Sequence, residues 1–198
     1  MSNTEITALK AELRRDFRAA RRHLKPALRT DLDQRICDHL IRSPVLRKAR
    51  CIAAYLAFDG EPDLGPAMAG WSEEGKRIAL PVINSPRPGH MELRLWAPVQ
   101  GLRKNTLGIG EPSSGLPVPA AELDVVLVPL VAFDRDGRRL GMGAGYFDRF
   151  LAPVCEQSRP RRVGVAYGLQ EAGNLPEEPW DISLHAVVTE GGWFTCPG

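Results

Sequence analysis

The stretch VVLVPLVAF, residues 125–133, gives the strongest indication of the fold. It is apolar throughout, which is typical of a strand that is buried on both faces of a sheet. CIAAYLAF (51–58) and RRVGVAYG (161–168) have the same character. Amphipathic stretches with a helical period lie between such segments, so predicted strands alternate with predicted helices. This pattern predicts an α/β protein with a mostly parallel sheet that helices cover on both faces.

Shorter or more exposed strands complete the predicted sheet. RIALPVI (77–83) is a further buried strand, whereas MELRLW (91–96) alternates like a strand with one exposed face. HAVVTEGGWF (185–194) predicts two short final strands. DRDGRR (134–139) predicts a hairpin, because Asp-Gly favours tight turns. Residues 97–123 are rich in Gly and Pro and predict loops with little regular structure.

The N-terminal region predicts helices that pack on this sheet. Apolar residues recur at steps of three and four from about residue 4 to 24, and a second helix is expected over 27–42. A third helix is expected over 63–74. Thr4 and Asp63 are the expected N-caps of the first and third helices.

Composition limits the class of protein. The chain has 198 residues, 43% of them hydrophobic and 25% charged, as expected for a single soluble domain over 1–198 that includes the N-terminal helices at about 4–42. The longest apolar run is too short for a transmembrane helix, and the N-terminus resembles no targeting signal, so we expect a cytoplasmic protein without membrane contact. The spacing of the four cysteines and four histidines predicts neither a disulfide framework nor a zinc site.

Positive charge is concentrated near the N-terminus, although the net charge of the chain is only +2. The residues that fall beside the apolar stripe of the first helix are Lys10, Arg14, Arg18, Arg21 and Lys25. Such a flank is either a solvated charged face or a set of phosphate or nucleic-acid contacts. The nearly neutral chain disfavours a nucleic-acid-binding module.

A glycine-rich turn is the clearest candidate for a ligand site. Gly141, Gly143 and Gly145 stand directly before a short amphipathic helix over 146–154. Glycines let backbone N–H groups converge on an anion, and a helix N-terminus adds partial positive charge. A phosphate cradle and a plain flexible turn both fit these glycines, whose spacing matches neither the dinucleotide fingerprint nor the Walker loop.

Charged residues near this turn and near the first strand have two readings each. Asp148 either offsets the helix dipole or holds a divalent cation. Arg138 and Arg139 either neutralise phosphate or are exposed hairpin charges. Glu61 follows a buried strand, at the sheet edge where α/β proteins bind ligands, or is an ordinary loop carboxylate.

Five blocks in order carry a family resemblance over nearly the whole chain. They are Lys10, Leu13 and Arg14; EPD (61–63); Leu102, Asn105, Gly108, Ile109, Glu111 and Pro112; RLGMGAGYFD (139–148); and Asp181 with VVTE (187–190). Together they resemble the 5-formyltetrahydrofolate cyclo-ligase family, also called 5,10-methenyltetrahydrofolate synthetase.

The resemblance implies a fold and a reaction. The implied fold is a three-layer α/β/α sandwich related to sugar-phosphate isomerases and CoA transferases. The implied reaction is the ATP- and Mg²⁺-dependent cyclisation of 5-formyltetrahydrofolate to 5,10-methenyltetrahydrofolate, with release of ADP and phosphate. The formyl oxygen attacks the γ-phosphate of ATP, and N10 of the folate then displaces phosphate from the iminium phosphate. The expected partners are therefore the folate and ATP, and we expect a monomer.

The resemblance also implies roles for individual residues. The ATP-binding residues are Lys10, Arg14, Arg139, Gly141, Met142, Gly143, Ala144, Gly145, Tyr146 and Phe147. The folate-binding residues are Leu56, Glu61, Met142, Gly143, Ala144, Gly145 and Tyr146, with Glu61 at the pterin edge. Asp148 and Asp181 would bind Mg²⁺, and Lys104 and Arg139 would serve catalysis by neutralising phosphate. Arg18, Arg21 and Lys25 are expected to stay a solvated face.

This chain departs from common family patterns at a few positions. Met142 and Ala144 stand where some members carry basic residues, and Phe147 replaces a common tyrosine. Trp180 precedes Asp181 where the family often has histidine. The main alternative function is an ATP-dependent ligase or kinase that acts on another pterin-like substrate. A small-molecule sensor that binds without turnover is a further alternative.

Overall fold

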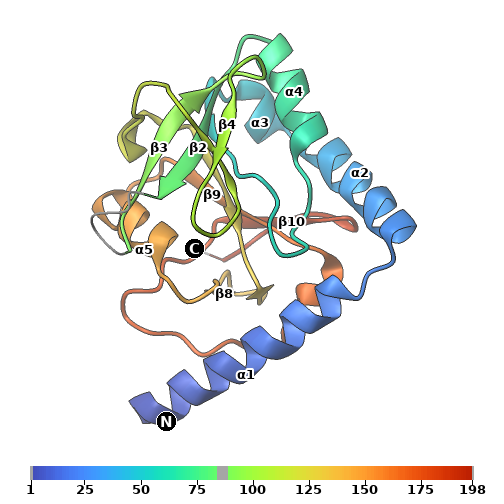
Figure 1. Ribbon diagram of the computed structural model, residues 1–198. Coiled ribbons are helices and arrows are strands. Elements are labelled where there is room, and N and C mark those ends of the chain that lie inside the picture. The colour runs from blue at the N-terminus through green and yellow to red at the C-terminus, as the bar shows by residue number, and fades with distance from the viewer. Residues whose placement is uncertain (1, 84–88, 198) are drawn as a thin grey trace.

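A seven-stranded sheet forms the centre of the computed structural model, which describes residues 2–83 and 89–197 (Figure 1). The strand order is β11-β10-β9-β6-β1-β2-β3. The five inner strands run parallel, and the edge strands β3 and β11 are antiparallel to their neighbours. The bounds are β1 Cys51–Ala53, β2 Arg77–Ile83, β3 Met91–Trp96, β6 Val125–Pro129, β9 Arg161–Val165, β10 Ala186–Thr189 and β11 Gly192–Thr195. The predicted mostly parallel α/β sheet is confirmed.

Helices cover both faces of this sheet. Their bounds are α1 Asn3–Arg22, α2 Pro26–Arg42, α3 Pro44–Lys48, α4 Gly65–Glu73 and α5 Tyr146–Leu151, with 3₁₀ turns η1 Ala120–Glu122, η2 Ala152–Val154 and η3 Gly168–Gln170. Buried residues of α2, α3 and α4 pack with Leu127 on one face, and α5 and η2 pack with Val126 and Val128 on the other. Since successive strand residues point to opposite faces, β6 contributes to both cores. The expected three-layer arrangement is confirmed.

The prediction of one continuous strand over 125–133 is wrong about where the strand ends. β6 stops at Pro129, and β7 (Ala132–Phe133) pairs instead with β8 (Arg139–Leu140) in a separate two-stranded sheet. Proline has no backbone N–H, so it cannot continue a ladder in a central strand. The predicted hairpin at 134–139 is confirmed as the β7–β8 connection.

The N-terminal helix begins and ends earlier than its pattern predicts. Ser2, rather than Thr4, is the N-cap, because its side chain accepts from the Glu5 N–H while the Glu5 carboxylate accepts from the Ser2 N–H. α1 then lies against β7, where Leu13 and Phe17 pack on a small third core. Figure 1 shows it as a long helix set apart from α2–α4, with its middle beside β8.

Residues 97–123 are more regular than expected. β4 (Leu102–Lys104) and β5 (Gly110–Pro112) form an antiparallel hairpin. The Asn105 side chain closes its turn by accepting from the backbone N–H groups of Leu107 and Ile109. Strands of three residues leave no alternation to read, so composition alone predicted loops here.

Further elements are shorter than predicted, among them β9, which ends at Val165, and α5, which ends at Leu151, whereas the strands at 77–83 and 91–96 match their predictions. β1 covers three residues instead of 51–58, because the chain after it turns out of the sheet into a loop. α4 lies inside the predicted 63–74. The prediction of Asp63 as its N-cap is wrong by one residue, because Leu64 is the N-cap, although the Asp63 side chain accepts from the Gly65 N–H. Among the described residues, no helix combines the length and hydropathy needed to cross a membrane.

Candidate functional site

Two adjoining cavities lie beyond the carboxyl ends of the parallel strands β1, β2 and β6. The first cavity is lined by Ile83 and Pro129, the last residues of β2 and β6, and by residues after β1 such as Leu56. The second cavity lies between α1, the glycine-rich turn at 141–145 and the segment before β10. In open α/β sheets, this edge is where ligands bind.

One wall is common to the two cavities. The residues that line both are Arg139, Gly141, Ala144, Gly145 and Asp148. Two ligands bound side by side would therefore meet at the glycine turn, with one cation and one carboxylate beside them.

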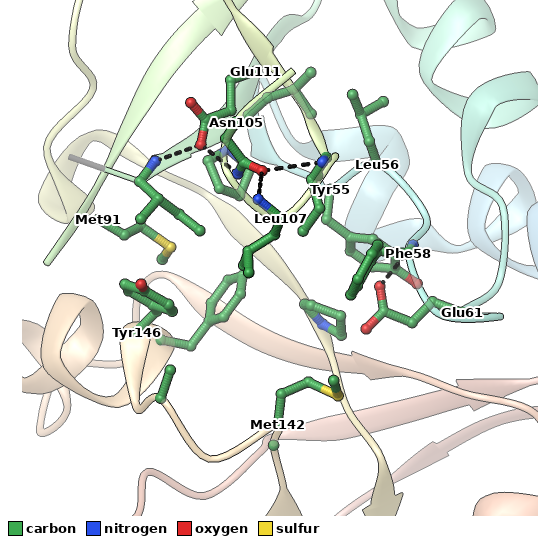
Figure 2. Close-up of a pocket in the computed structure, with 18 of the residues that line it drawn as sticks. Tyr55, Leu56, Phe58, Glu61, Met91, Asn105, Leu107, Glu111, Met142 and Tyr146 are labelled. Atoms are coloured by element: carbon green, nitrogen blue, oxygen red, sulfur yellow. Dashed lines mark hydrogen bonds between the residues drawn. The ribbon is translucent and has the colours of Figure 1, made fainter. Parts of the chain in front are cut away.

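The first cavity is mainly apolar and carries one carboxylate on the loop after β1. Figure 2 shows Leu56, Phe58 and Glu61 on one side of the space and Met91 and Tyr146 on the other. The Glu61 carboxylate accepts from the backbone N–H of Phe58 at 3.1 Å. Burial raises the pKa of Glu61 to about 7, and the Arg21 cation opposes this rise.

The β4–β5 hairpin closes another side of this cavity. Glu111 Oε1 accepts from the Ile83 N–H and from the Asn105 amide, both at 2.8 Å, which fixes the hairpin to the end of β2. Leu107, at the hairpin turn, is 53% exposed and lines the cavity (Figure 2). Asn105 and Glu111 belong to a block of the family resemblance that implied no role for them, and Leu107 was not predicted. The asparagine within a Gly-rich stretch was the available signal for this turn.

The glycine turn lies against Arg14 of α1. Gly143 and Gly145 have φ values of 104° and 65°, in the region that favours glycine. Arg14 Nε donates to the Gly141 carbonyl at 2.9 Å. Arg149, in α5, donates to the Ala144 carbonyl. The turn is thus held from both sides, and its position beside an arginine suits an anionic ligand.

Lys10 belongs to the second cavity and is paired with two carboxylates. Its Nζ lies 2.6 Å from Asp181 Oδ2 and 2.7 Å from Glu178 Oε2. Burial favours the neutral amine, but the hydrogen bonds to the two carboxylates outweigh it and raise the pKa of Lys10 above its ordinary value. Lys10 is therefore a firmly charged cation at this wall.

Arg139 and Asp148 form an ion pair in the shared wall. Asp148 Oδ1 also accepts from the backbone N–H of Ile182 at 3.1 Å. The Arg139 side chain is 5% exposed, and its Nε is a buried donor without a hydrogen-bond partner in the described part of the chain. A buried donor of this kind costs stability unless a ligand completes it.

The carboxylates of the second cavity fit a magnesium ion that arrives with phosphate groups. Asp148 and Asp181 both line this cavity. Among residues 2–83 and 89–197, no group of three or more His, Cys, Asp or Glu could hold a metal. Mg²⁺ commonly uses one or two carboxylates and completes its coordination with water and substrate phosphates. A resident all-protein metal site is not built here.

Most of the expected site residues come together. Those that line at least one of the two cavities are Lys10, Arg14, Leu56, Glu61, Arg139, Gly141, Met142, Gly143, Ala144, Gly145, Tyr146, Phe147, Asp148 and Asp181. Lys104 lies on the exposed strand β4 and is not among the described residues that line either cavity. The structure therefore does not bring Lys104 to the site.

The remaining basic residues of the first helix differ from one another. Lys25 is exposed, as expected. The expectation of a solvated face is wrong for Arg21, whose side chain is fully buried against Asp59. Arg18 is partly exposed and also pairs with Asp59. Arg18 and Arg21 differ from Lys25 because of the tertiary structure: the loop after β1 places the Asp59 carboxylate against the last turns of α1.

Comparisons with known proteins agree on one family. The model described as "5-formyltetrahydrofolate cyclo-ligase family" matches residues 6–190. The 5-formyltetrahydrofolate cyclo-ligase of Escherichia coli K12 is 37% identical over 175 residues, covering 87% of this chain and 96% of that protein. The Haemophilus influenzae protein of the same name is 32% identical over 184 residues, covering 92% and 98%. The NMR structure of Aquifex aeolicus 5,10-methenyltetrahydrofolate synthetase matches with a TM-score of 0.84 and 34% identity, covering 96% of this chain and 94% of that one.

Proposed function

Because this chain belongs to the 5-formyltetrahydrofolate cyclo-ligase family, we propose that its two cavities hold the two substrates of that reaction. The chain is an enzyme with cyclo-ligase activity, which forms 5,10-methenyltetrahydrofolate from 5-formyltetrahydrofolate. In our proposal the folate occupies the first cavity and ATP the second. The wall common to the two cavities is the observation that carries this assignment.

The first cavity suits a reduced pterin. Its apolar walls, which include Leu56 and Phe58, offer surface to a flat heterocycle. Glu61 is the carboxylate at the β1 side of this space. An ionised carboxylate accepts hydrogen bonds only, and a pterin edge presents N–H donors, so Glu61 would orient the ring.

The second cavity suits a polyphosphate. Lys10, Arg14 and Arg139 supply three cations, and the glycine turn supplies backbone N–H groups. Arriving phosphates would compete with Asp181 and Glu178 for Lys10. The indole of Trp180 is 60% exposed and lines the same cavity, so it offers a stacking surface to the nucleobase.

The proposed chemistry takes place at the common wall. The formyl oxygen of the folate attacks the γ-phosphorus of ATP, the bond to ADP breaks, and N10 then attacks the phosphorylated formyl carbon. Phosphate leaves with its bonding electron pair, and the N10 proton passes to solvent. Such a transfer needs positioning and charge neutralisation more than a nucleophile from the protein.

Arg139 is suited to this step because its Nε–H, which has no partner among the described residues, lies in the wall between the two ligands. A donor that is already fixed in place stabilises developing negative charge without reorganising. Bound Mg²⁺, held by Asp148 and Asp181, would supply further neutralisation of the phosphate oxygens. We also propose that one chain is sufficient for the reaction, since a single chain provides both cavities.

An absorbance assay tests this proposal directly. Purified protein is mixed with 5-formyltetrahydrofolate, ATP and Mg²⁺, and formation of the methenyl product is followed in the ultraviolet. An increase that requires ATP supports the proposal. Folate and ATP binding, measured separately by calorimetry, distinguish the alternatives. Binding of both without product indicates a sensor, and ATP binding without folate binding indicates another pterin-like substrate.

A further inference from the structure

Arg21 is a buried cation that joins three segments of the chain. It lies in the last turn of α1 with no exposed side-chain surface. Its Nε donates to the Asp59 carbonyl and its Nη1 to the Leu130 carbonyl, each at 2.9 Å. Its Nη2 donates to the Asp59 carboxylate at 3.1 Å. The guanidinium thus ties α1 to the loop after β1 and to the segment after β6.

Asp59 does not depend on Arg21 alone. Its carboxylate also pairs with Arg18 at 2.7 Å and with Arg22. Burial opposes ionisation of Asp59, but the hydrogen bonds from Arg18 and Arg22 outweigh it and keep the pKa of Asp59 below its ordinary value. Since three arginines share one carboxylate, Arg21 retains positive charge for a second partner.

That second partner is Glu61. Arg21 Nη2 lies 3.7 Å from Glu61 Oε1, while the other Glu61 oxygen accepts from the Phe58 N–H. Glu61 lines the first cavity, whereas Arg21 is not among its described lining residues. Arg21 therefore lies behind Glu61 and can reach a ligand in this cavity only through its neighbours.

We propose that Arg21 is the positioning residue that holds the Glu61 carboxylate as an anion aimed at the folate. The inference rests on the proposed function, which places the folate in the first cavity. Arg21 shares α1 with Lys10 and Arg14, so the same helix would set both the pterin-binding carboxylate and the phosphate-binding cations.

The charges around Glu61 support this role. The charged or titratable groups that lie behind it or line its cavity are Arg21 from α1, Tyr55 and Asp59 from its own loop, Glu111 from β5, Tyr146 from α5, and Arg139 and Asp148 from the common wall. Burial raises the pKa of Glu61 to about 7, Asp59 adds to the rise, and Arg21 is the cation that opposes it. Without Arg21, a smaller fraction of Glu61 would be ionised at neutral pH, and the protonated form lacks the acceptor-only character of the carboxylate.

The test compares Arg21→Met with Arg22→Met, which removes another Asp59 partner that is 53% exposed and makes no described contact with Glu61. The KM for the folate is measured at saturating ATP from pH 6 to pH 9. The Glu61 carboxyl is titrated by ¹³C NMR, with its signal assigned from Glu61→Gln. We expect Arg21→Met to move the Glu61 midpoint up by about one pH unit, and the smaller ionised fraction at pH 7 should raise the folate KM roughly fivefold. Arg22→Met should change the folate KM by less than about twofold and the Glu61 midpoint by less than about 0.3 pH units.

Two results would overturn the proposal. An unchanged Glu61 midpoint in Arg21→Met is one, because a purely structural role does not move a titration. The other is an equal rise in the KM values for folate and ATP that does not recover at pH 9. The NMR titration requires no turnover, so it tests the Arg21–Glu61 coupling even if the wild-type protein fails to bind folate.

A double-mutant cycle covers the case in which Arg21→Met does not fold. Arg21→Lys keeps a cation but loses the geometry of the guanidinium. If Arg21 acts through Glu61, Arg21→Lys should raise the folate KM in the wild-type background and change it less than about twofold in the Glu61→Gln background. Equal effects in both backgrounds would refute the inference.

Discussion

The ammonium group of Lys10 lies 2.6 Å from the carboxylate of Asp181, although the two residues are 171 positions apart in the chain. This contact joins α1 to the segment before β10 across the second cavity. The cation and the carboxylate that we assign to ATP and Mg²⁺ thus form an ion pair with each other. Binding of the nucleotide has to replace this pairing, so we expect ATP affinity to depend on both partners.

Lys10→Gln should raise the KM for ATP by about 10- to 100-fold, because it removes a charge-assisted contact to phosphate. The folate KM should change less than about twofold, since Lys10 lines the second cavity and is not among the described residues that line the first. Steady-state kinetics with each substrate varied in turn measures both. Arg15→Gln is the matched control, because Arg15 is exposed on the same helix and pairs with Asp16. An unchanged ATP KM would remove Lys10 from the site.

Asp148→Asn should lower kcat by about 100-fold or more, because it removes the carboxylate of the common wall while keeping its shape. The amide oxygen still accepts from the Ile182 N–H, so the far-UV circular dichroism and cooperative unfolding should be preserved. Asp136→Asn, at an exposed carboxylate that also pairs with an arginine, is the control and should retain full activity. If Asp148→Asn unfolds, or if it retains wild-type kcat, the assigned role is incorrect.

Glu61→Gln should stabilise the protein at alkaline pH while weakening folate binding. The folded-state pKa of Glu61 is about 7, above the ordinary value of 4.5. The folded protein therefore binds more protons than the unfolded chain between these values, so the contribution of Glu61 to the unfolding free energy falls as pH rises from about 4.5 to 7.

The neutral amide lacks this titration and keeps an oxygen for the Phe58 N–H. Urea unfolding at pH 8 should show a gain of about 2 kcal/mol for Glu61→Gln, with a smaller difference at pH 5. Glu74→Gln, at an exposed carboxylate, should change neither value. A Glu61→Gln variant that is less stable than wild type at both pH values would contradict the prediction.

ATP should protect Trp180 from acrylamide quenching if the base stacks on it. Trp180 is 60% exposed, whereas Trp71 is 1% exposed and Trp96 and Trp193 are half-buried, so the long-wavelength emission reports mainly on Trp180. Trp180→Ala should raise the ATP KM roughly 5- to 100-fold, and Trp180→Phe should restore most of the affinity because it retains an aromatic face. Quenching that stays the same with ATP bound, as verified by calorimetry, would place the base elsewhere.

The sequence predicted those parts of the fold in which local pattern and tertiary environment coincide. The strands at 77–83 and 91–96 match because their apolar residues are continuous or alternating over six or seven positions. The strand that begins at Val125 was predicted too long. The apolar run continues past Pro129, but the residues after it form β7, which pairs with β8 in another sheet. The β4–β5 hairpin was missed because strands of three residues carry no periodicity.

The candidate site divides in the same way. The glycine turn and the blocks around Lys10, Glu61 and Asp148 could be recognised from the sequence alone, because each is a run of residue types at fixed spacing. Spacing along a helix also placed Arg21 in the same flank as Lys10 and Arg14, but it gave no means of telling these three apart.

By itself, the sequence determined the class of fold, the mostly parallel sheet and most of the residues that gather at its carboxyl edge, since these follow from local periodicity and from motifs. Only the tertiary structure decided which charges become buried partners. It set Lys10 against Asp181, and it set Arg21 against Asp59 and behind Glu61. The physical reason is that burial and the distance between two charges depend on where remote segments meet, and these two quantities decide whether a charged side chain is solvated or part of a site.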